Sequence, residues 1–157
     1  MSARHLVLVR HAEAQAAGAS GDQQRPLSRH GRTQAAGLAR QLAQRLGAGH
    51  MLCSSARRTR ETADIVQQQT GWPEPVIETG IYEAAPATLL ALLREQPDTL
   101  RELVVIGHNP GMEAIAAHLA GRPVLPMGTA SAALFEVHNR WRELGPECSR
   151  LITLVRP

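Results

Sequence analysis

Short runs of consecutive apolar residues alternate along the chain with longer segments in which apolar residues recur every three or four positions. An uninterrupted apolar run is typical of a strand covered on both faces, and the wider spacing is typical of an amphipathic helix. The runs predict strands at residues 5–9, 51–53, 76–77, 103–106, 132–137 and 151–155. The helical spacing predicts helices at about residues 29–46, 56–69, 86–96 and 110–119.

Residues that favour helix ends stand where these helices are expected to begin and end. Ser28 precedes the first helical segment and can cap its N-terminus. Pro86 opens the third helix, and Asn109-Pro110 can cap and open the fourth. Gly47 and Gly71 follow the first and second helices, where glycine commonly ends a helix. These residues support the order of elements that the apolar pattern predicts.

Strands that alternate with helices are typical of a parallel sheet, because each helix returns the chain to the start of the next strand. Runs such as LVLV and LVVI are apolar throughout, so we expect helices on both faces. The expected fold class is α/β, a three-layer α/β/α sandwich with a mostly parallel central sheet. A chain of 157 residues suits one domain, which we expect to cover residues 1–157.

Three expected strands are followed directly by polar residues that are suited to catalysis. Arg10-His11 follows the first strand, Ser54 to Arg58 follow the second, and Gly107-His108 follow the fourth. The carboxyl ends of parallel strands meet at one edge of a sheet, where ligands bind in open α/β folds. We therefore expect two histidines and at least two arginines to meet there from distant parts of the sequence.

These residue types together fit the transfer of a phosphoryl group. Neutral imidazole is a nucleophile near pH 7, and its attack on phosphorus divides one difficult step into two. The transferring group carries negative charge that must be stabilised, and the planar guanidinium of arginine matches its oxygens. The pattern predicts that His11 is the nucleophile and that Arg10 and an arginine near residue 58 bind the phosphoryl oxygens.

Helical spacing distinguishes Arg57 from Arg58. Thr62, Ile65 and Val66 follow Arg58 at the positions that share its helix face. The matching positions after Arg57 include Glu61 and Asp64, both of which are polar. Arg58 is therefore predicted to face inward, and Arg57 to lie on the surface with Glu61 as a possible partner.

Four segments resemble the histidine phosphatase superfamily. LVLVRHAEAQ resembles its Arg-His-Gly signature, with Ala12 in place of the usual glycine. SSARRTRETA resembles the Ser-x-x-x-Arg-x-x-x-Thr segment, with Ser54, Arg58 and Thr62 in register. VVIGHNPGME resembles the second-histidine segment, and RPLSRHGRTQA resembles the entry to the family's first helix. The RPLS and IYEAAPATLLALL segments and the short length are similar to the SixA-type phosphohistidine phosphatases.

The resemblance implies a phosphoglycerate mutase-like fold and a reaction that needs no metal or other cofactor. It implies that His11 accepts phosphate from a phosphohistidine and passes it to water. Arg10 and Arg58 would bind phosphate oxygens, and His108 would stabilise the transferring group. The implied partner is a phosphorylated protein such as a histidine phosphotransfer domain in signal transduction.

The proton donor is left open by the resemblance. Glu83 lies in the segment that supplies the acid in many members of the superfamily. Asp22, which precedes RPLS, is the competing candidate in the SixA-like branch. Arg25 is a further candidate for binding phosphate.

Composition argues against several other classes of protein. The net charge is only +3 and the basic residues, all arginine, are dispersed, so nucleic-acid binding is not expected. Cys53 and Cys148 lack disulfide or metal spacing and fit buried free thiols in a reducing compartment. No apolar run has the length of a membrane helix, and the polar start does not resemble a secretory signal. We therefore expect a cytoplasmic protein without a membrane partner.

The function expected from the sequence is a phosphatase that acts on phosphohistidine in a protein. The sequence leaves no room for a large cap between the first helix and the next strand, and an open site suits a protein substrate. One alternative keeps the site and changes the substrate to a sugar phosphate, a nucleotide or a phosphoamino acid. The alternative from another class is an inactive phosphate-binding regulatory module.

Overall fold

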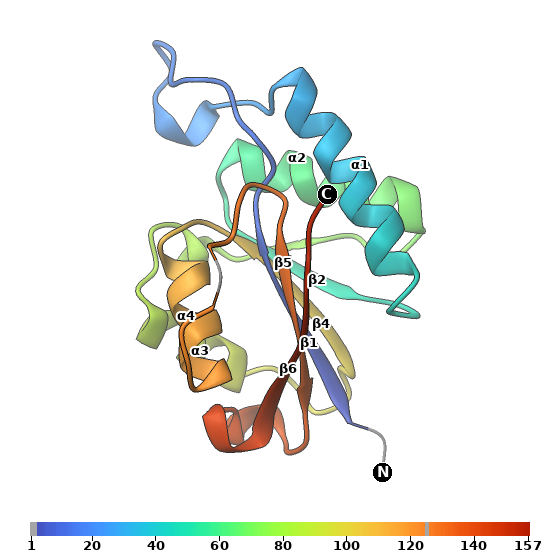
Figure 1. Ribbon diagram of the computed structural model, residues 1–157. Coiled ribbons are helices and arrows are strands. Elements are labelled where there is room, and N and C mark those ends of the chain that lie inside the picture. The colour runs from blue at the N-terminus through green and yellow to red at the C-terminus, as the bar shows by residue number, and fades with distance from the viewer. Residues whose placement is uncertain (1–2, 125) are drawn as a thin grey trace.

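A computed structural model describes residues 3–124 and 126–157, and a six-stranded sheet runs through its centre (Figure 1). The strand order is β3-β2-β4-β1-β5-β6. The strands are β1 (Arg4–Arg10), β2 (His50–Cys53), β3 (Val76–Ile77), β4 (Glu102–Gly107), β5 (Ala132–Val137) and β6 (Ser149–Val155). The pairs among β1 to β4 are parallel, whereas β5 pairs antiparallel with both β1 and β6. The expectation of a mostly parallel sheet is confirmed.

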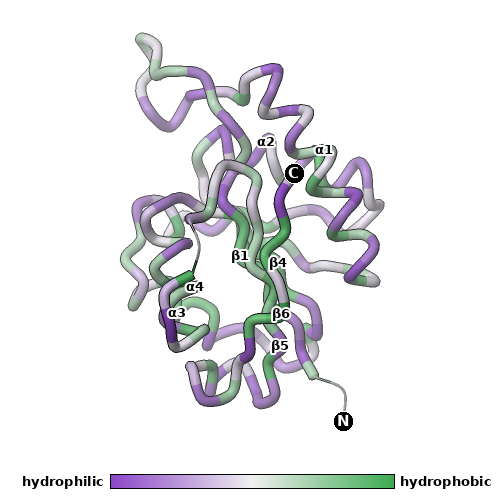
Figure 2. Tube along the Cα trace, viewed as in Figure 1, coloured by the Kyte–Doolittle hydropathy of each residue, from purple (hydrophilic) through white to green (hydrophobic). Residues whose placement is uncertain are grey.

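Helices cover both faces of the sheet. Helices α1 (Arg29–Ala43) and α2 (Arg57–Thr70) lie on one face, and α3 (Pro86–Arg94) and α4 (Gly111–Ala120) on the other (Figure 1). The two faces carry separate buried clusters, one built with residues of α1 and α2 and one with residues of α3 and α4. Figure 2 shows the hydrophobic strands between these more polar helices. The predicted three-layer α/β/α sandwich is therefore confirmed.

The apolar pattern places every strand, and most differences lie at element ends. Ser28 caps α1 as predicted, because its side chain accepts a hydrogen bond from the Gly31 amide at 3.0 Å. Helix α1 ends at Ala43, three residues earlier than expected, although Leu46 beyond it is still buried. Helix α4 begins at Gly111, one residue later than expected, and Asn109, which lies two residues before it, accepts from the Glu113 amide at 3.2 Å.

The strand register brings the expected functional junctions to one edge. Arg10 at the end of β1 is paired with Gly107 at the end of β4, and Cys53 at the end of β2 is paired with Ile106. The His11 amide then donates to the Gly107 carbonyl at 3.0 Å. The register thus places three junctions that are far apart in the sequence side by side at one edge of the sheet.

The long segment between β1 and α1 is packed closely against the start of α1. A Cβ atom built on Gly31 would lie 2.0 Å from the main-chain oxygen of Glu13, so only glycine allows this approach. The Ser28 amide also donates to that oxygen, at 2.9 Å. The beginning of this segment, at Glu13, is therefore held against the N-terminal end of α1.

The remaining expectations from composition concern the cysteines and the membrane. Cys53 and Cys148 are buried and free, as expected. Among the described residues, no helix has both the length and the apolar character needed to cross a bilayer.

Candidate active site

His11 lies directly after β1 and is 8% exposed. Its Nδ1 atom is 2.7 Å from the main-chain oxygen of Ala12. A carbonyl oxygen can only accept, so Nδ1 of the neutral ring carries the proton and donates it to this bond. The lone pair of His11 is therefore on Nε2, at the end of the ring away from the main chain.

Main-chain contacts hold the residues around His11 in place. The Ala12 amide donates to Thr62 Oγ1 at 3.1 Å, which ties the end of β1 to α2. The Ala130 amide donates to the carbonyl oxygens of both Arg10 and His11, each at 3.0 Å. Ala130 has a φ of 58°, a left-handed conformation that is unfavourable for alanine. The chain thus adopts a strained conformation in order to fix the backbone of Arg10 and His11.

His108 stands next to His11, with 5.4 Å between the ring centroids. Its Nδ1 atom is 3.2 Å from Nη2 of Arg58, and its Nε2 atom is 2.7 Å from Ser54 Oγ. Arginine can only donate, so Nδ1 accepts and the neutral ring donates from Nε2 to Ser54. Ser54 is fully buried and also accepts from the Ala56 amide at 3.1 Å.

Burial keeps both histidine rings neutral. It is the main cause that lowers the pKa of His11 to about 4 and that of His108 to about 3. The charges of Arg58 and Arg25 lower both pKa values further, and Arg10 lowers that of His11. A neutral imidazole is the nucleophilic form, so His11 has the required protonation state at neutral pH.

Two arginine side chains, those of Arg10 and Arg58, lie near the histidines. The Arg10 guanidinium donates to the Met127 carbonyl at 3.1 Å. Arg58 is buried, whereas its neighbour Arg57 is exposed and paired with Glu61 at 3.0 Å, in agreement with the helical spacing. The Nε atoms of Arg10 and Arg58 are buried and have no hydrogen-bond partner within the described residues. The planar, charged guanidinium groups of Arg10 and Arg58 match the shape and charge of a phosphoryl group.

Asp22 lies against Arg58, on the 3-10 turn η1 (Asp22–Gln24). Its Oδ2 atom accepts from Arg58 at 3.2 Å and from the Tyr82 hydroxyl at 2.5 Å, and its Oδ1 atom accepts from Arg25 at 3.3 Å. Tyr82 is the main cause that lowers the pKa of Asp22 to about 2, and the two arginines lower it further. Asp22 is thus an ionised partner of Arg58, and Arg25 lies close enough to pair with it.

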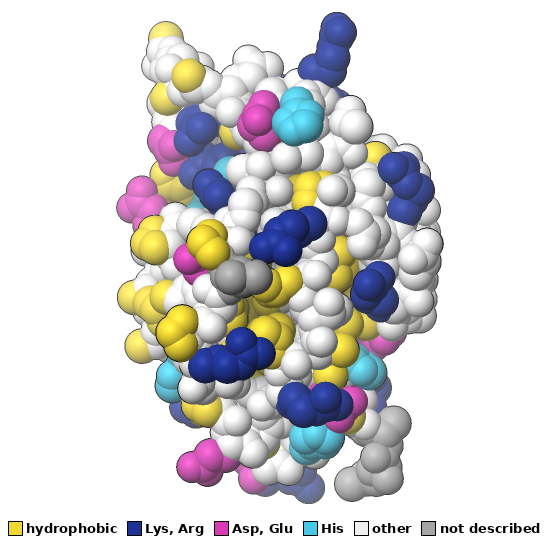
Figure 3. Space-filling view, viewed as in Figure 1, with side chains coloured by type: hydrophobic (Ala, Val, Ile, Leu, Met, Phe, Trp, Pro, Cys, Tyr) yellow, Lys and Arg dark blue, Asp and Glu magenta, His cyan; other side chains and the backbone are white. Residues whose placement is uncertain are grey.

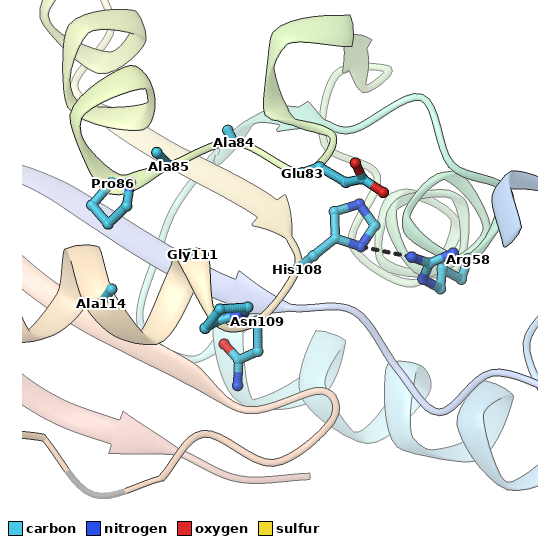
Figure 4. A pocket seen from close by; sticks show the side chains of 10 residues that line it. Arg58, Glu83, Ala84, Ala85, Pro86, His108, Asn109, Gly111 and Ala114 are labelled. Carbon is cyan, nitrogen blue, oxygen red and sulfur yellow. Dashed lines mark hydrogen bonds between the residues drawn. The ribbon is translucent and has the colours of Figure 1, made fainter.

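Glu83 lines a cavity of about 440 Å³ beside His108 (Figure 4). The cavity begins at Arg58 and His108 and extends between the N-terminal ends of α3 and α4. Glu83 is exposed and has a φ of 55°. The structure therefore brings both candidate proton donors to the site but gives them different surroundings.

Sequence reasoning missed two residues of this arrangement. Tyr82 donates to Asp22 and also packs edge-on against His108, with ring centroids 5.4 Å apart. The sequence offered only one indication that Tyr82 belongs to the site: it is the sole tyrosine of the chain and stands immediately before Glu83. Ser54 was noted as part of the polar junction after β2 and for its motif register, but not as the hydrogen-bond partner of His108.

The surface around the site is mixed in charge. Figure 3 shows arginine, histidine and acidic side chains gathered at the upper left, near the end of the molecule where the segment after β1 lies. Elsewhere on this face, arginines are dispersed over several elements. Arginines are thus present both at the site and elsewhere on this face, and acidic side chains lie beside those at the site.

Comparison with known proteins gives this arrangement a family context. The chain is 25% identical to a candidate phosphohistidine phosphatase SixA from Nakamurella multipartitia, with a TM-score of 0.87 over 100% of this chain and 98% of that one. It is 28% identical to a candidate SixA from Agrobacterium tumefaciens, with a TM-score of 0.80 over 98% of each chain. It is also 31% identical to an uncharacterized chloroplastic protein of Arabidopsis thaliana, over 98% of this chain and 78% of that protein.

The resemblance to the SixA-type branch that the sequence motifs indicate is confirmed by these structures. The family model of the histidine phosphatase superfamily (branch 1) matches residues 6–87, which include β1 and His11, α1, α2 and the start of α3. The chain therefore belongs to the histidine phosphatase superfamily, and both its family and its structural neighbours support a phosphatase activity.

Proposed function

We propose that this protein is a phosphatase in which His11 accepts the phosphoryl group from a phosphohistidine of another protein and then transfers it to water. The observation that carries the proposal is the hydrogen bond from His11 Nδ1 to the Ala12 carbonyl, which leaves Nε2 as the free nucleophilic atom. The neutral ring, the two adjacent arginines and His108 support the same chemistry.

In the first step, Nε2 of His11 attacks phosphorus and the bond to the leaving group breaks. Arg10 and Arg58 carry the positive charge that the phosphoryl oxygens require as the group flattens. His108 can donate to the same group from Nδ1 once Arg58 turns from that atom to the phosphoryl oxygens, because the Ser54 hydroxyl can then donate to Nε2 instead of accepting from it. Protein groups alone supply the charge and hydrogen bonds of this step.

In the second step, water attacks the phosphorus atom of phosphorylated His11. The His11 ring keeps its Nδ1 proton throughout, so it departs as a neutral imidazole while water supplies both protons of the released H₂PO₄⁻. The Ala12 carbonyl stabilises the positive ring of the intermediate, since it accepts the Nδ1 proton in a charge-assisted hydrogen bond. The residues present thus complete a turnover without a separate proton donor for hydrolysis.

The loops that carry Asp22 and Glu83 are exposed, and this exposure supports a protein as the substrate. The Asp22 side chain is 45% exposed, and Glu83 is exposed as well, so a residue on another protein can reach His11. The likeness to candidate SixA phosphatases supports phosphohistidine as the phosphoryl donor.

The proposal is tested with a phosphorylated histidine phosphotransfer protein. We expect rapid loss of phosphohistidine from that protein and transient labelling of His11, detected as an acid-labile, alkali-stable phosphoryl group. A small phosphomonoester such as p-nitrophenyl phosphate is assayed in parallel. Fast turnover of the small ester without loss of phosphohistidine would favour the small-substrate alternative, and no turnover of either would favour a phosphate-binding module.

A further inference from the structure

We propose that the cavity beside His108 binds the imidazole ring of the substrate phosphohistidine and that Glu83 accepts a hydrogen bond from the ring nitrogen that carries no phosphorus. The inference rests on the proposed function and names the part of the substrate that the site recognises. It gives Glu83 a role different from that of a general acid for an oxygen leaving group.

The walls of the cavity suit a flat, largely apolar ring. Ala84, Ala85 and Pro86 line one side, at the start of α3, and Pro110, Gly111 and Ala114 line the other, at the start of α4. The two sides meet closely, since a Cβ atom built on Gly111 would lie 2.7 Å from the Ala84 carbonyl oxygen. These small side chains leave an apolar slot of about 440 Å³, enough for an imidazole ring and part of its main chain.

One end of the slot is shared with the phosphate site. Arg58 and His108 line the cavity and are also the groups that stand next to His11 (Figure 4). A phosphoryl group held by these two residues therefore has its attached ring at the entrance to the slot. This placement links the apolar walls to the phosphoryl donor rather than to a separate ligand.

Glu83 is the carboxylate that remains available at this entrance. Asp22 accepts from Arg58, Arg25 and Tyr82, whereas Glu83 makes no hydrogen bond or ion pair within the part of the chain that the structure describes. Its carboxylate points toward the His108 ring in Figure 4. Its left-handed φ of 55° is unfavourable for a residue with a side chain, and such strain is common at functional positions.

The charges around Glu83 are compatible with this role. Arg58 of α2 and His108 after β4 line the same cavity, and Tyr82 precedes Glu83 in the chain. The Tyr82 proton is committed to Asp22, which raises the pKa of Tyr82 to about 12. Arg58 already donates to Asp22 and His108, and His108 is neutral, so a protonated ring nitrogen of the substrate is the group best placed to pair with Glu83.

The hydrogen bond would make the substrate ring a better leaving group. A ring that holds a proton on its second nitrogen leaves as neutral imidazole, while a ring without that proton must leave as an anion. In the transfer, the bond from phosphorus to the substrate nitrogen breaks and its electron pair stays on that nitrogen. The bond from phosphorus to Nε2 of His11 forms, and no proton has to move.

Glu83 would thus accept a hydrogen bond from the substrate ring, as the Ala12 carbonyl accepts one from the His11 ring. Each accepts the proton on the ring nitrogen opposite the phosphorus atom, so the two rings are matched phosphoryl carriers. A match of this kind is specific for phosphohistidine, because a phosphate ester has no second ring nitrogen.

The test compares Glu83→Gln with Glu95→Gln, a matched control at an exposed position beyond the far end of α3. At about pH 8, E83Q should lower kcat/KM for the phosphohistidine protein about 10- to 100-fold more than for p-nitrophenyl phosphate. The extra loss should shrink at about pH 6, because more of the substrate ring then carries its own proton. E95Q should leave both activities unchanged.

A second variant tests the slot itself. Ala114 is exposed, so Ala114→Phe should fill the slot without overpacking the core. We expect a higher KM for the phosphohistidine protein and an unchanged melting temperature. An unchanged KM would remove the slot from the substrate site.

Other outcomes separate this inference from the proposed function. If wild-type protein hydrolyses phosphohistidine and E83Q loses no more activity on it than on p-nitrophenyl phosphate, only the inference fails. If E83Q is impaired most on phenyl phosphate, whose leaving group needs a proton, Glu83 is a general acid and the inference also fails. If the wild type does not act on phosphohistidine at all, the proposed function itself fails.

Discussion

The two halves of the site differ in how they are built. His11, Arg58 and Ser54 belong to the buried half, which lies at the ends of adjacent strands and at the start of α2. Asp22 and Glu83 belong to the exposed rim, which is formed by turns on separate loops. The buried half is fixed by the sheet register, while the rim depends on contacts between loops. Under the proposed function, the phosphoryl chemistry therefore depends on the fold, and the choice of substrate depends on the rim.

The same contrast appears in the electrostatics. Burial is the main cause of the lowered pKa values of His11 and His108, whereas a hydrogen bond from Tyr82 is the main cause for Asp22. Ion pairs exposed to solvent contribute little because water screens them. Changes in the buried half should therefore have large effects, and changes in the rim smaller and more selective ones.

The largest effect is expected from His11→Ala. It removes the atom that we propose accepts the phosphoryl group, so kcat should fall by about four orders of magnitude or more. Single-turnover assays with a radiolabelled phosphohistidine protein should show no labelled enzyme. Circular dichroism serves as the control for an intact fold, and a folded variant that keeps near-normal turnover would disprove the role of His11.

A smaller loss is expected from Arg58→Ala, about 100- to 1000-fold in kcat/KM, because one of the two arginines that we propose to bind the phosphoryl oxygens disappears. The matched control is Arg57→Ala, one position earlier on the same helix, where the side chain is exposed and paired with Glu61. That variant should stay within about 2-fold of wild type. Similar losses in the two variants would contradict the division between buried and exposed arginines.

The pH dependence of stability should reveal the burial of the two histidines. Between about pH 6.5 and pH 4 the unfolded chain binds protons at both residues, while the folded protein holds His11 and His108 neutral. The free energy of unfolding should therefore fall as the pH is lowered through this range. The lowered pKa of Asp22 affects stability only below about 3.8 and does not interfere.

Urea denaturation at about pH 7 and pH 5 measures this effect. A double variant with His11→Asn and His108→Asn should lose less stability than wild type between the two pH values, because it lacks both buried titrating groups. An equal loss in the two proteins would show that these histidines are not the source of acid sensitivity.

The smallest effect is expected from Asp22→Asn on the rim. Without its negative charge, Arg58 is freer to bind an anion, so the inhibition constant for inorganic phosphate should fall about 2- to 5-fold. The matched control is Asp98→Asn, which alters an exposed carboxylate that pairs with Arg4 at the start of β1. Weaker phosphate binding in the Asp22 variant would indicate that Asp22 mainly orients Arg58.

The buried half could be predicted from the sequence because its signals are periodic. Apolar runs fix where β1, β2 and β4 end, and residues that follow parallel strands must share one edge. The inward position of Arg58 follows from the spacing of Thr62 and Val66 on the same helix face. Strand direction is not encoded in such runs, so the antiparallel β5 could not be predicted from its apolar pattern.

The rim could not be predicted in the same way. The hydrogen bond between Tyr82 and Asp22 joins residues 60 positions apart on two irregular segments. Neither segment has a period that indicates which way its side chains point. The sequence therefore named Asp22 and Glu83 as competing proton donors, and only three-dimensional contacts distinguish the paired Asp22 from the unpaired Glu83.

The hydrogen bond between His11 and Ala12 has a consequence for how this protein tolerates change. The group that orients the His11 ring is the carbonyl of the next residue, and every amino acid carries that carbonyl. No replacement at position 12 can delete the acceptor, although a replacement can shift it if the new side chain does not fit the buried space. Point mutations elsewhere would change other contacts of the site. The Nδ1 proton of His11 keeps its acceptor for as long as the backbone of β1 and of the turn after it keeps its conformation.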